Sequence, residues 1–507
     1  MIVLFLCFIK VCFQDFSLCY NQSIKVFRLL EISCIEEFPI DVTPLQFIST
    51  YFLVILAGIF VFSALSHILY QKRSPTSMIS WMVSIFFLPY IVVPLYFLIG
   101  IRKREGKNKK EYVKFDHACE HPLHESDDSH HLIQNLLQKN GMPPATRGNT
   151  FELITNNTEA YDRLLKEIGQ AKKSIDICTY IFQFDTMTQT VLDALTQKAK
   201  EGVKVRLLMD LVGSLGASFN QKGFKALKKA GGEVAFFTPI LKRPFQNYIN
   251  LRNHRKIYLF DQTTLLSGGM NLSNEYMGEA DGTKRWEDLL YCLNGPSVYH
   301  FYHIFENDWI YATKEEKKIE LKVEESCEGE SRVQVVPSGP DIPSDALYEA
   351  LLNAIYNAKK RIWIVTPYFV PDENMIQALV IAHHKGVDIK LITPKSSDHL
   401  LADMGRSAYM RELDEIGADV VLYEGEMLHA KAILFDDIGG MVGSVNFDNR
   451  SLFLNYEVVT FVYSPEFIES IESWMNGLIE HSSRGMEKPS KVREAFENVM
   501  KVFAPLL

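Results

Sequence analysis

The amino-acid sequence predicts an α/β protein with two similar domains, preceded by N-terminal transmembrane segments. Two uncharged apolar runs lie near the beginning of the chain, at residues 47–70 and 78–101. From about residue 148 onward, short β-branched strands alternate with amphipathic helices. This second part then repeats itself after about 180 residues, which is a normal length for one domain.

Length and composition exclude several classes of protein. The chain has 507 residues, of which 47% are hydrophobic, so it can form two or three domains with sizeable cores. Its 53 basic and 62 acidic residues give a net charge of −9, which makes it a poor candidate for general nucleic-acid binding. The 8 cysteines form no CxxC pair, so neither a disulfide scaffold nor a zinc ribbon is indicated. We expect no nucleic-acid partner, no metal and no cofactor.

The two apolar runs predict a membrane-embedded region over residues 47–101. Residues 47–70 contain no Asp, Glu, Lys or Arg. As a helix of about 36 Å, this run would cross a hydrocarbon core of about 30 Å. Residues 78–101 are equally uncharged, but Pro89 and Pro94 interrupt backbone hydrogen bonding there, so this run is expected to kink or re-enter. The alternative is a pair of buried core helices.

Residues 102–147 are predicted to be a basic juxtamembrane and linker region. A basic cluster favours the cytoplasmic side of a membrane and attracts anionic lipids. Its members are Arg102, Lys103, Arg104, Lys107, Lys109, Lys110 and Lys114. Residues 117–131 contain five His and Cys119, which are zinc-ligand types at no standard spacing, so a solvated linker is favoured over a metal site. Residues 1–46 receive no assigned role.

The remaining chain divides into two halves, predicted at residues 148–330 and 331–507. AKKSIDICTYIF at 171–182 resembles AKKRIWIVTPYF at 358–369. GVKVRLL at 202–208 likewise matches GVDIKLI at 386–392. Because helix and strand alternate in each repeat, we expect a largely parallel sheet.

Each half ends with the same His-x-Lys-x4-Asp motif. The motif residues are His254, Lys256 and Asp261 in the first half, and His429, Lys431 and Asp436 in the second. Asn271 and Asn446 follow at the same offset. Alternate residues of a strand share a face, so the His and Lys of each motif should point the same way. If the halves pack around a pseudo-twofold axis, both pairs surround one anion.

This set of side chains suits the chemistry of a phosphodiester. Two Lys can neutralise the phosphate, while one neutral His attacks phosphorus to give a phosphohistidine. The other His donates a proton to the leaving alkoxide and then accepts one from the incoming alcohol. Asp288 and Glu457 follow the two motifs and are expected to orient the His rings. Asp261 and Asp436 are catalytic candidates or, alternatively, turn residues that hold the strand ends.

The paired motifs resemble the phospholipase D superfamily and, within it, the bacterial cardiolipin synthase family. The narrower resemblance rests on RSPTSMISWMVSIFFLP (73–89), GMPPATRGN (141–149), NLRNHRKI (250–257) and GSVNFDNRSLFLNYE (443–457). It implies two phospholipase D-like domains with the active site at their interface. It also implies that two phosphatidylglycerol molecules are joined into cardiolipin with release of glycerol. The expected location is the bacterial inner membrane, multi-pass, with the catalytic domains on the cytoplasmic side.

By analogy with the superfamily, His254 is expected to be the nucleophile and His429 the general acid and then base. The pseudo-symmetry allows the reverse assignment. A membrane-bound phospholipase D that uses water is the nearest rival, followed by a transphosphatidylase with another donor or acceptor. A nuclease of the superfamily and a scaffold with an inactive site are further alternatives. The sequence predicts no oligomeric state.

Overall fold

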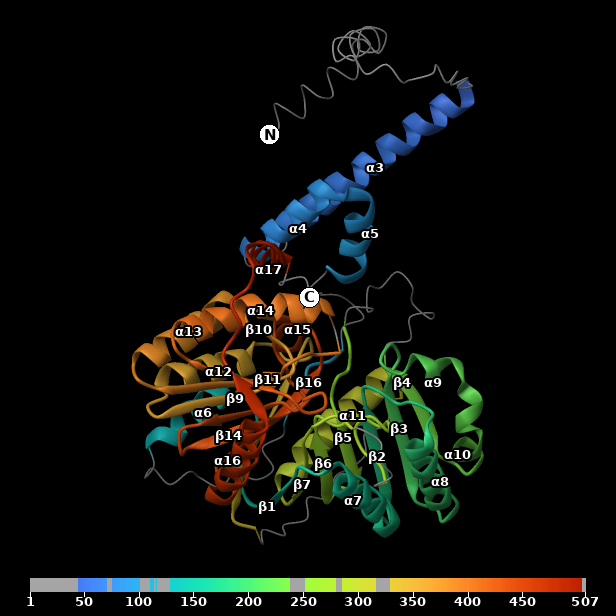
Figure 1. Ribbon diagram of the computed structural model, residues 1–507. Helices are drawn as coiled ribbons and strands as arrows, with labels where there is room; N and C mark the ends of the chain where they lie inside the picture. Colours follow the sequence, from blue (N-terminus) through green and yellow to red (C-terminus); the bar gives the residue numbers. More distant parts are fainter. Residues whose placement is uncertain are drawn as a thin grey trace, which may run out of the picture. The chain divides into compact units, whose positions relative to one another are not determined.

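The computed structural model describes residues 44–70, 75–100, 110–113, 115, 128–237, 251–279, 285–315, 329–398 and 400–503. Residues 1–43, most of the basic cluster and the His-rich residues 117–127 lie outside this description, so the expectations for them are not addressed. The chain divides into two compact units, Met1–Phe62 and Ser63–Leu507. Both repeated halves belong to the second unit (Figure 1).

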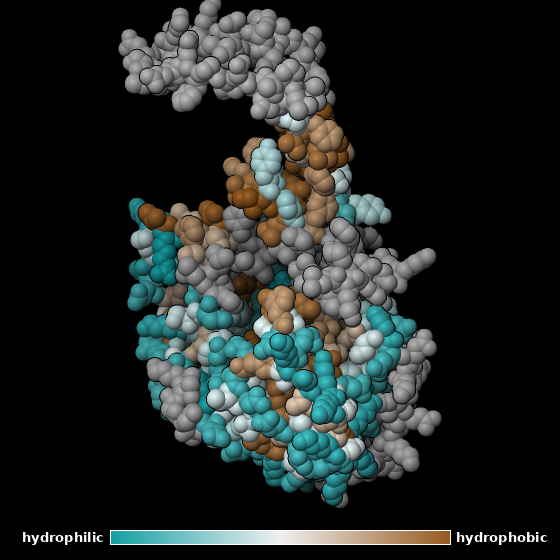
Figure 2. All heavy atoms as spheres, turned by 90° about the vertical axis from the view of Figure 1, so that its right-hand side faces the viewer, coloured by the Kyte–Doolittle hydropathy of each residue, from teal (hydrophilic) through white to brown (hydrophobic). Residues whose placement is uncertain are grey.

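The first apolar run forms one long helix, α3, at Pro44–Tyr70. Its segment Tyr51–Tyr70 has 20 residues and a mean hydropathy of 2.4, which is long and apolar enough to cross a membrane. Most of its side chains are exposed, and its surface is hydrophobic, whereas the folded body displays a mostly hydrophilic face (Figure 2). Among the described residues, α3 is the one helix that meets the criteria for a span.

The second apolar run is broken into two shorter helices, α4 at Pro75–Phe87 and α5 at Pro89–Ile99. Leu88 interrupts the run with φ −134° and ψ 56°, and Pro89 starts the next helix because proline is accepted in a first turn. The two helices contact each other through Trp81 and Tyr96, whose rings meet edge-on at 5.0 Å. The expected kink is therefore confirmed, and a 13-residue helix of about 20 Å is too short to cross a membrane alone.

A single 15-stranded sheet runs through both halves. Its order is β17-β12-β11-β9-β13-β14-β16-β8-β1-β7-β6-β5-β2-β3-β4, so the second half mirrors the first about the central β8–β1 pair. The strands of the first half are β1 (Thr146–Ile154), β2 (Ser174–Thr179), β3 (Lys204–Asp210), β4 (Glu233–Phe237), β5 (Ile257–Phe260), β6 (Thr264–Gly268) and β7 (Leu290–Asn294). Those of the second are β8 (Ser331–Ser338), β9 (Arg361–Val365), β11 (Asp388–Pro394), β12 (Asp419–Tyr423), β13 (Ala432–Phe435), β14 (Gly439–Gly443), β16 (Glu457–Val462) and β17 (Ser482–Arg484).

The expectation of a largely parallel sheet was wrong. Parallel pairing in this sheet is confined to β2–β3–β4 and β9–β11–β12. The other ladders are antiparallel, including β5–β6, whose strands are joined by the three residues 261–263. Parallel neighbours need a long crossover, which only the helix-containing first part of each repeat supplies. A small separate sheet pairs β10 (Phe369–Val370) with β15 (Phe447–Asp448).

Helices cover the sheet and complete two hydrophobic cores (Figure 1). They are α6 (Asp128–Lys139), α7 (Asn157–Gln170), α8 (Thr186–Lys200), α9 (Leu215–Phe219), the 3-10 turn Gln221–Phe224, α10 (Lys225–Lys229), α11 (Ser297–Thr313), α12 (Ala346–Asn357), α13 (Glu373–His384), α14 (Leu400–Glu415), α15 (Asn449–Phe453), α16 (Pro465–Glu480) and α17 (Lys491–Phe503). One core is confined to the first half. The larger core continues from the first half into the second, so the two halves form one body.

Candidate active site

Both motifs lie in extended segments that immediately precede matching strands. His254 and Lys256 come before β5, and His429 and Lys431 come before β13. Each segment is tied to the opposite half by its backbone. The His254 amide donates to the Tyr456 carbonyl at 2.9 Å, and the His429 amide donates to a first-half carbonyl at 2.7 Å. The paired motifs therefore meet where the two halves join.

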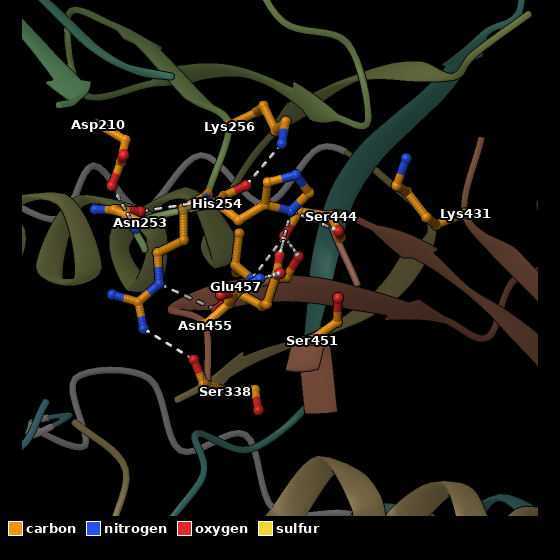
Figure 3. Close-up of polar contacts among 12 residues, drawn as sticks. Asp210, Asn253, His254, Lys256, Ser338, Lys431, Ser444, Ser451, Asn455 and Glu457 are labelled. Atoms are coloured by element: carbon orange, nitrogen blue, oxygen red, sulfur yellow. Dashed lines mark hydrogen bonds and ion pairs between the residues drawn. The ribbon is translucent and has the colours of Figure 1, made fainter. Parts of the chain in front are cut away.

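The His254 ring is held by the second half of the chain. Its Nδ1 lies 3.0 Å from Glu457 Oε2 and 3.1 Å from the Ser444 carbonyl oxygen (Figure 3). Glu457 also accepts hydrogen bonds from the Ser444 hydroxyl and from the Asn455 side chain. Because both partners of Nδ1 are acceptors, Nδ1 carries the hydrogen and Nε2 keeps its lone pair. Among the described residues, no hydrogen bond occupies that Nε2.

The His429 ring is held by the first half. Its Nδ1 lies 2.7 Å from Asp288 Oδ2, and the rings of Tyr276 and Trp286 each lie 5.2 Å from it. Lys431 Nζ lies 2.8 Å from Nδ1 and 3.0 Å from Nε2. Lys431 Nζ also donates to the backbone carbonyl of His429. Since Nδ1 gives its hydrogen to Asp288, Nε2 is the ring nitrogen that can accept from Lys431.

The structure brings each acid to the histidine of the other half. Asp288 approaches its histidine beside Gly269, where a Cβ atom would lie 2.1 Å from Asp288 Oδ1. Gly269 thereby leaves room for the carboxylate. The equivalent position in the second half is Ser444, whose hydroxyl donates to Glu457.

Two buried lysines make the site ready for an anion. Burial lowers the pKa of Lys256 to about 7 and that of Lys431 to about 8, and Lys431 also disfavours the charge on Lys256. Burial likewise lowers the pKa of His254, and it lowers that of His429 to about 3. Each histidine is further affected by the lysine of the other half, so the half-sites form one electrostatic unit. An anion would relieve the cost of these buried positive charges.

Two buried carboxamides have hydrogen-bonding capacity to spare. Asn271 Oδ1 accepts the Ile181 amide at 3.1 Å, while its Nδ2 has no partner among the described residues. Asn446 Oδ1 also lacks a partner within the described part of the chain. The oxygen and nitrogen of such an amide can exchange places, so Asn446 can also present a donor. Buried donors without partners are costly, and a ligand oxygen would satisfy them.

The structure does not bring Asp261 and Asp436 to the histidines. The Asp261 carboxylate accepts the backbone amides of residues 172–174 at 2.6–3.0 Å. Asp436 does the same for residues 359–361. Both have left-handed backbones, with φ 52° and 48°. Asp261 follows Lys256 by five positions of extended chain, about 16 Å, so the geometry gives these residues the alternative, turn-holding position.

Sequence reasoning missed several residues that line the site or lie behind it. Tyr276 and Trp286 lie against His429, and no spacing in the sequence announced them. Arg255 occupies the alternate position between His254 and Lys256 and is fully buried. Lys110 was expected to face lipid within the basic cluster, but it is 4% exposed and pairs with two carboxylates instead. Among the described residues, no group of three or more His, Cys, Asp and Glu could hold a metal ion.

Two family models match the chain. The model described as cardiolipin synthase, phospholipase D-like domain, matches residues 164–309 and 351–479. The model described as phospholipase D-nuclease N-terminal matches residues 59–100.

Several named relatives match most of the chain. Cardiolipin synthase 1 of Bacillus cereus is 31% identical over 95% of this chain and 99% of its own. The cardiolipin synthase of Clostridium perfringens is 32% identical over 86% of this chain and 95% of its own. The major cardiolipin synthase of Bacillus subtilis is 32% identical over 80% of this chain and 87% of its own.

A solved structure shares the fold. The phosphatidylserine synthase of Haemophilus influenzae superposes with a TM-score of 0.55 at 17% identity. The match covers 74% of this chain and 100% of that one. At this identity, the likeness concerns the fold alone.

Proposed function

The chain belongs to the cardiolipin synthase family of phospholipase D-like proteins, as its paired motifs predicted, and we propose that it joins two phosphatidylglycerol molecules into cardiolipin and glycerol. One observation carries the proposal. Two imidazoles, each held by the carboxylate of the opposite half, share one buried site with two lysines. Such a site fits a phosphodiester anion between a nucleophile and an acid–base group.

In the first stage, His254 Nε2 attacks the phosphorus of one phosphatidylglycerol. The P–N bond forms while the bond from phosphorus to the glycerol oxygen breaks. His429, protonated in the bound complex, donates its Nε2 hydrogen to the departing glycerol. Lys256 and Lys431 neutralise the non-bridging oxygens, and the amides of Asn271 and Asn446 donate to them as charge develops in the transition state.

In the second stage, the glycerol hydroxyl of another phosphatidylglycerol replaces the first glycerol. Neutral His429 accepts the hydroxyl proton, the new P–O bond forms, and the P–N bond to His254 breaks. The proton that left with the first glycerol is thereby restored. Glu457 and Asp288 each hold an Nδ1 hydrogen, so both reacting Nε2 atoms stay directed at phosphorus.

The charges of the site explain how His429 becomes an acid despite its low resting pKa. With both lysines and His429 protonated, the site holds three positive charges. Asp288, Glu457 and the bound phosphodiester supply three negative charges. The substrate anion therefore brings one proton into the site, and it raises the pKa of His429 by opposing the effect of Lys431.

Association with a membrane agrees with this substrate. Helix α3 has the length and apolarity of a membrane span, and the N-terminal family model begins within it. The further proposal is a multi-pass protein of the bacterial inner membrane with its catalytic halves on the cytoplasmic side. It is supported by the uncharged run 78–101 and by the basic residues that follow it. Labelling cysteines introduced after α5 with a membrane-impermeant thiol reagent tests the sidedness.

A product assay tests the reaction. Membranes that contain the full-length protein receive labelled phosphatidylglycerol, and matched membranes contain His429→Ala. Cardiolipin and free glycerol from the intact protein alone support the proposal. Phosphatidic acid would mean that water is the acceptor and that the protein is a hydrolase. No turnover would remove phosphatidylglycerol as the donor, and mixed products with added phosphatidylethanolamine would identify a broader acceptor.

A further inference from the structure

A closed cluster of four charged side chains lies behind the first half-site. Arg255 contacts Asp308 Oδ1 at 2.8 Å and Asp341 Oδ1 at 3.0 Å. Lys110 Nζ also contacts Asp308 and lies 2.6 Å from Asp341 Oδ2. None of the four side chains is more than 2% exposed. Two cations therefore balance two anions in a space closed to solvent.

The cluster holds the backbone on both sides of the His254–Glu457 pair. Arg255 follows His254 in the chain, and its Nε donates to the Glu457 carbonyl at 3.0 Å. Asn253 precedes His254, and its Nδ2 donates to Asp308 Oδ2 at 2.9 Å. Figure 3 shows Asn253, His254 and Glu457 close together around this point. A shift of the cluster would move the histidine and its carboxylate.

Lys110 enters the cluster from outside both repeated halves. It follows the end of α5 at Ile99 by eleven residues and lies outside both family-model matches. Its segment is part of the core, since Val113 is 8% exposed and its amide donates to the Asp341 carbonyl at 3.2 Å. Without Lys110, two carboxylates would face a single guanidinium, and a buried unpaired charge is strongly unfavourable.

We propose that Lys110 is a positioning residue for the His254 half-site. Its ammonium balances the negative charge of Asp308 and Asp341 and leaves Arg255 bonded to the Glu457 carbonyl. If Lys110 is removed, the surplus carboxylate either takes up a proton or draws Arg255 away from Glu457. The chain that leaves the apolar segment thus contributes a charge on which the geometry of His254 depends. The activity readout of this inference rests on the proposed role of His254.

The test compares three variants of the full-length protein in phosphatidylglycerol vesicles. Lys110→Met should lower kcat by about 10- to 100-fold while KM changes by about threefold at most, because the nucleophile is misplaced rather than the phosphate site lost. Lys110→Arg should retain most activity. Lys110→Met/Asp341→Asn restores the charge balance and should recover most of the lost kcat. Lys200→Met, an exposed lysine at the end of α8, is the matched control.

A pH profile separates this role from simple packing. The deficit of Lys110→Met relative to the intact protein should grow as pH rises from about 5 to 8, since protonation relieves the surplus carboxylate at low pH. The other titratable groups facing the cluster are Cys178, Tyr311 and Tyr456. Burial raises the pKa of Cys178 and of Tyr456 above their ordinary values, so neither of these two groups gains a charge in this range.

Two results would overturn the inference. One is a Lys110→Met protein with the kcat and pH profile of the intact protein. The other is a deficit that neither low pH nor the charge-balanced double variant relieves, which would show a purely structural role. If Lys110→Met does not fold, the double variant decides alone, and its failure to fold or to act also rejects the idea. His254→Ala runs in parallel: if it still makes cardiolipin, the proposed function has failed instead.

Discussion

The two half-sites carry the same His, Lys and Asn but differ in what surrounds the imidazole. Among the described residues, His254 Nε2 has no hydrogen-bond partner, the ring lies 4.8 Å from the ring of Tyr180, and its carboxylate partner accepts from a serine hydroxyl and an asparagine. His429 Nε2 lies 3.0 Å from Lys431 Nζ, and two aromatic rings rather than one lie against the imidazole. The positions Gly269 and Ser444, equivalent in the repeat, account for part of the difference. Similar sequences thus have different surroundings, and the proposed mechanism gives the attack on phosphorus to the ring whose Nε2 has no partner among the described residues.

The largest expected effect comes from removing either imidazole. His254→Ala and His429→Ala should each lower cardiolipin synthesis by about 10³-fold or more, because both stages need both rings. A phosphatidyl donor with a p-nitrophenol leaving group distinguishes them, since nitrophenolate departs without a general acid. With this donor, His429→Ala should release one nitrophenolate per enzyme in a burst and retain the labelled phosphatidyl group.

His254→Ala should give no burst and no covalent label with the same donor. The measurement is rapid-mix absorbance together with denaturing gel analysis of the labelled protein. The opposite pattern, a burst in His254→Ala alone, would reverse the two roles while leaving the paired site intact.

Removing a carboxylate should have a smaller effect than removing a histidine, and it should affect the histidine of the opposite half. Glu457→Gln and Asp288→Asn should each lower kcat by about 10²- to 10⁴-fold, because the amide no longer fixes the tautomer or stabilises the imidazolium. Since Glu457 holds His254, Glu457→Gln should lose the nitrophenolate burst. Asp288→Asn should keep it. If each acid instead reproduced the loss of the histidine in its own half, the cross-half contacts would not operate during turnover.

The lysines should set how the affinity for substrate depends on pH. Their pKa values, about 7 for Lys256 and about 8 for Lys431, lie below the ordinary value, so both lose protons as pH rises through this window. The anionic lipid binds the protonated site. KM for phosphatidylglycerol should therefore increase by up to about tenfold per pH unit between about pH 7 and 8, and by up to about a hundredfold per unit above pH 8, where both lysines lose protons. Lys256→Met should remove the rise between about pH 7 and 8 and leave the dependence on Lys431. A KM that stays constant between about pH 7 and 9 would contradict the lowered pKa values.

The smallest effect on activity should come from the aspartates that end the two motifs. Asp261→Ala and Asp436→Ala each leave backbone amides without their acceptor. Each should lower the free energy of unfolding by about 1–3 kcal/mol, while kcat stays within about threefold. Thermal unfolding and turnover measured on the same preparations decide this. A large loss of kcat at unchanged stability would give these residues a direct role after all.

The sequence predicted which residues of the two halves correspond, but it did not predict which side chains of one half contact the other half. An offset of 175 residues between identical motifs identified both His and both Lys, because equivalent positions in a repeat have equivalent surroundings. It could not say that Asp288 serves His429, since spacing along a chain does not tell which half a side chain faces. The parallel sheet was overestimated for a related reason: a three-residue turn after β5 forces a hairpin, whatever the strands resemble.

For the charged residues, too, the sequence did not predict which groups each side chain contacts. Asp261 lies in a motif that occurs in both halves, but it faces backbone amides at the far end of its strand. Lys110 stands among six other basic residues, and nothing in that composition indicates that Lys110 is buried. Whether a charge meets solvent or another charge is decided by tertiary contacts hundreds of residues away.

The continuous sheet has a mechanical consequence. Strands β1 and β8 share a ladder, with Thr146 opposite Val333 and Asn149 opposite Ser331. The two halves are therefore joined by backbone hydrogen bonds along these two strands. The backbone hydrogen bonds from His254 to Tyr456 and from His429 to residue 287 add further connections between the halves. Separating the two halves would break these backbone hydrogen bonds, whereas two domains joined by a linker could rotate apart without breaking any. We expect the two lipids to react in succession at a site whose two halves keep the same separation, with the acceptor entering by the route the first glycerol leaves.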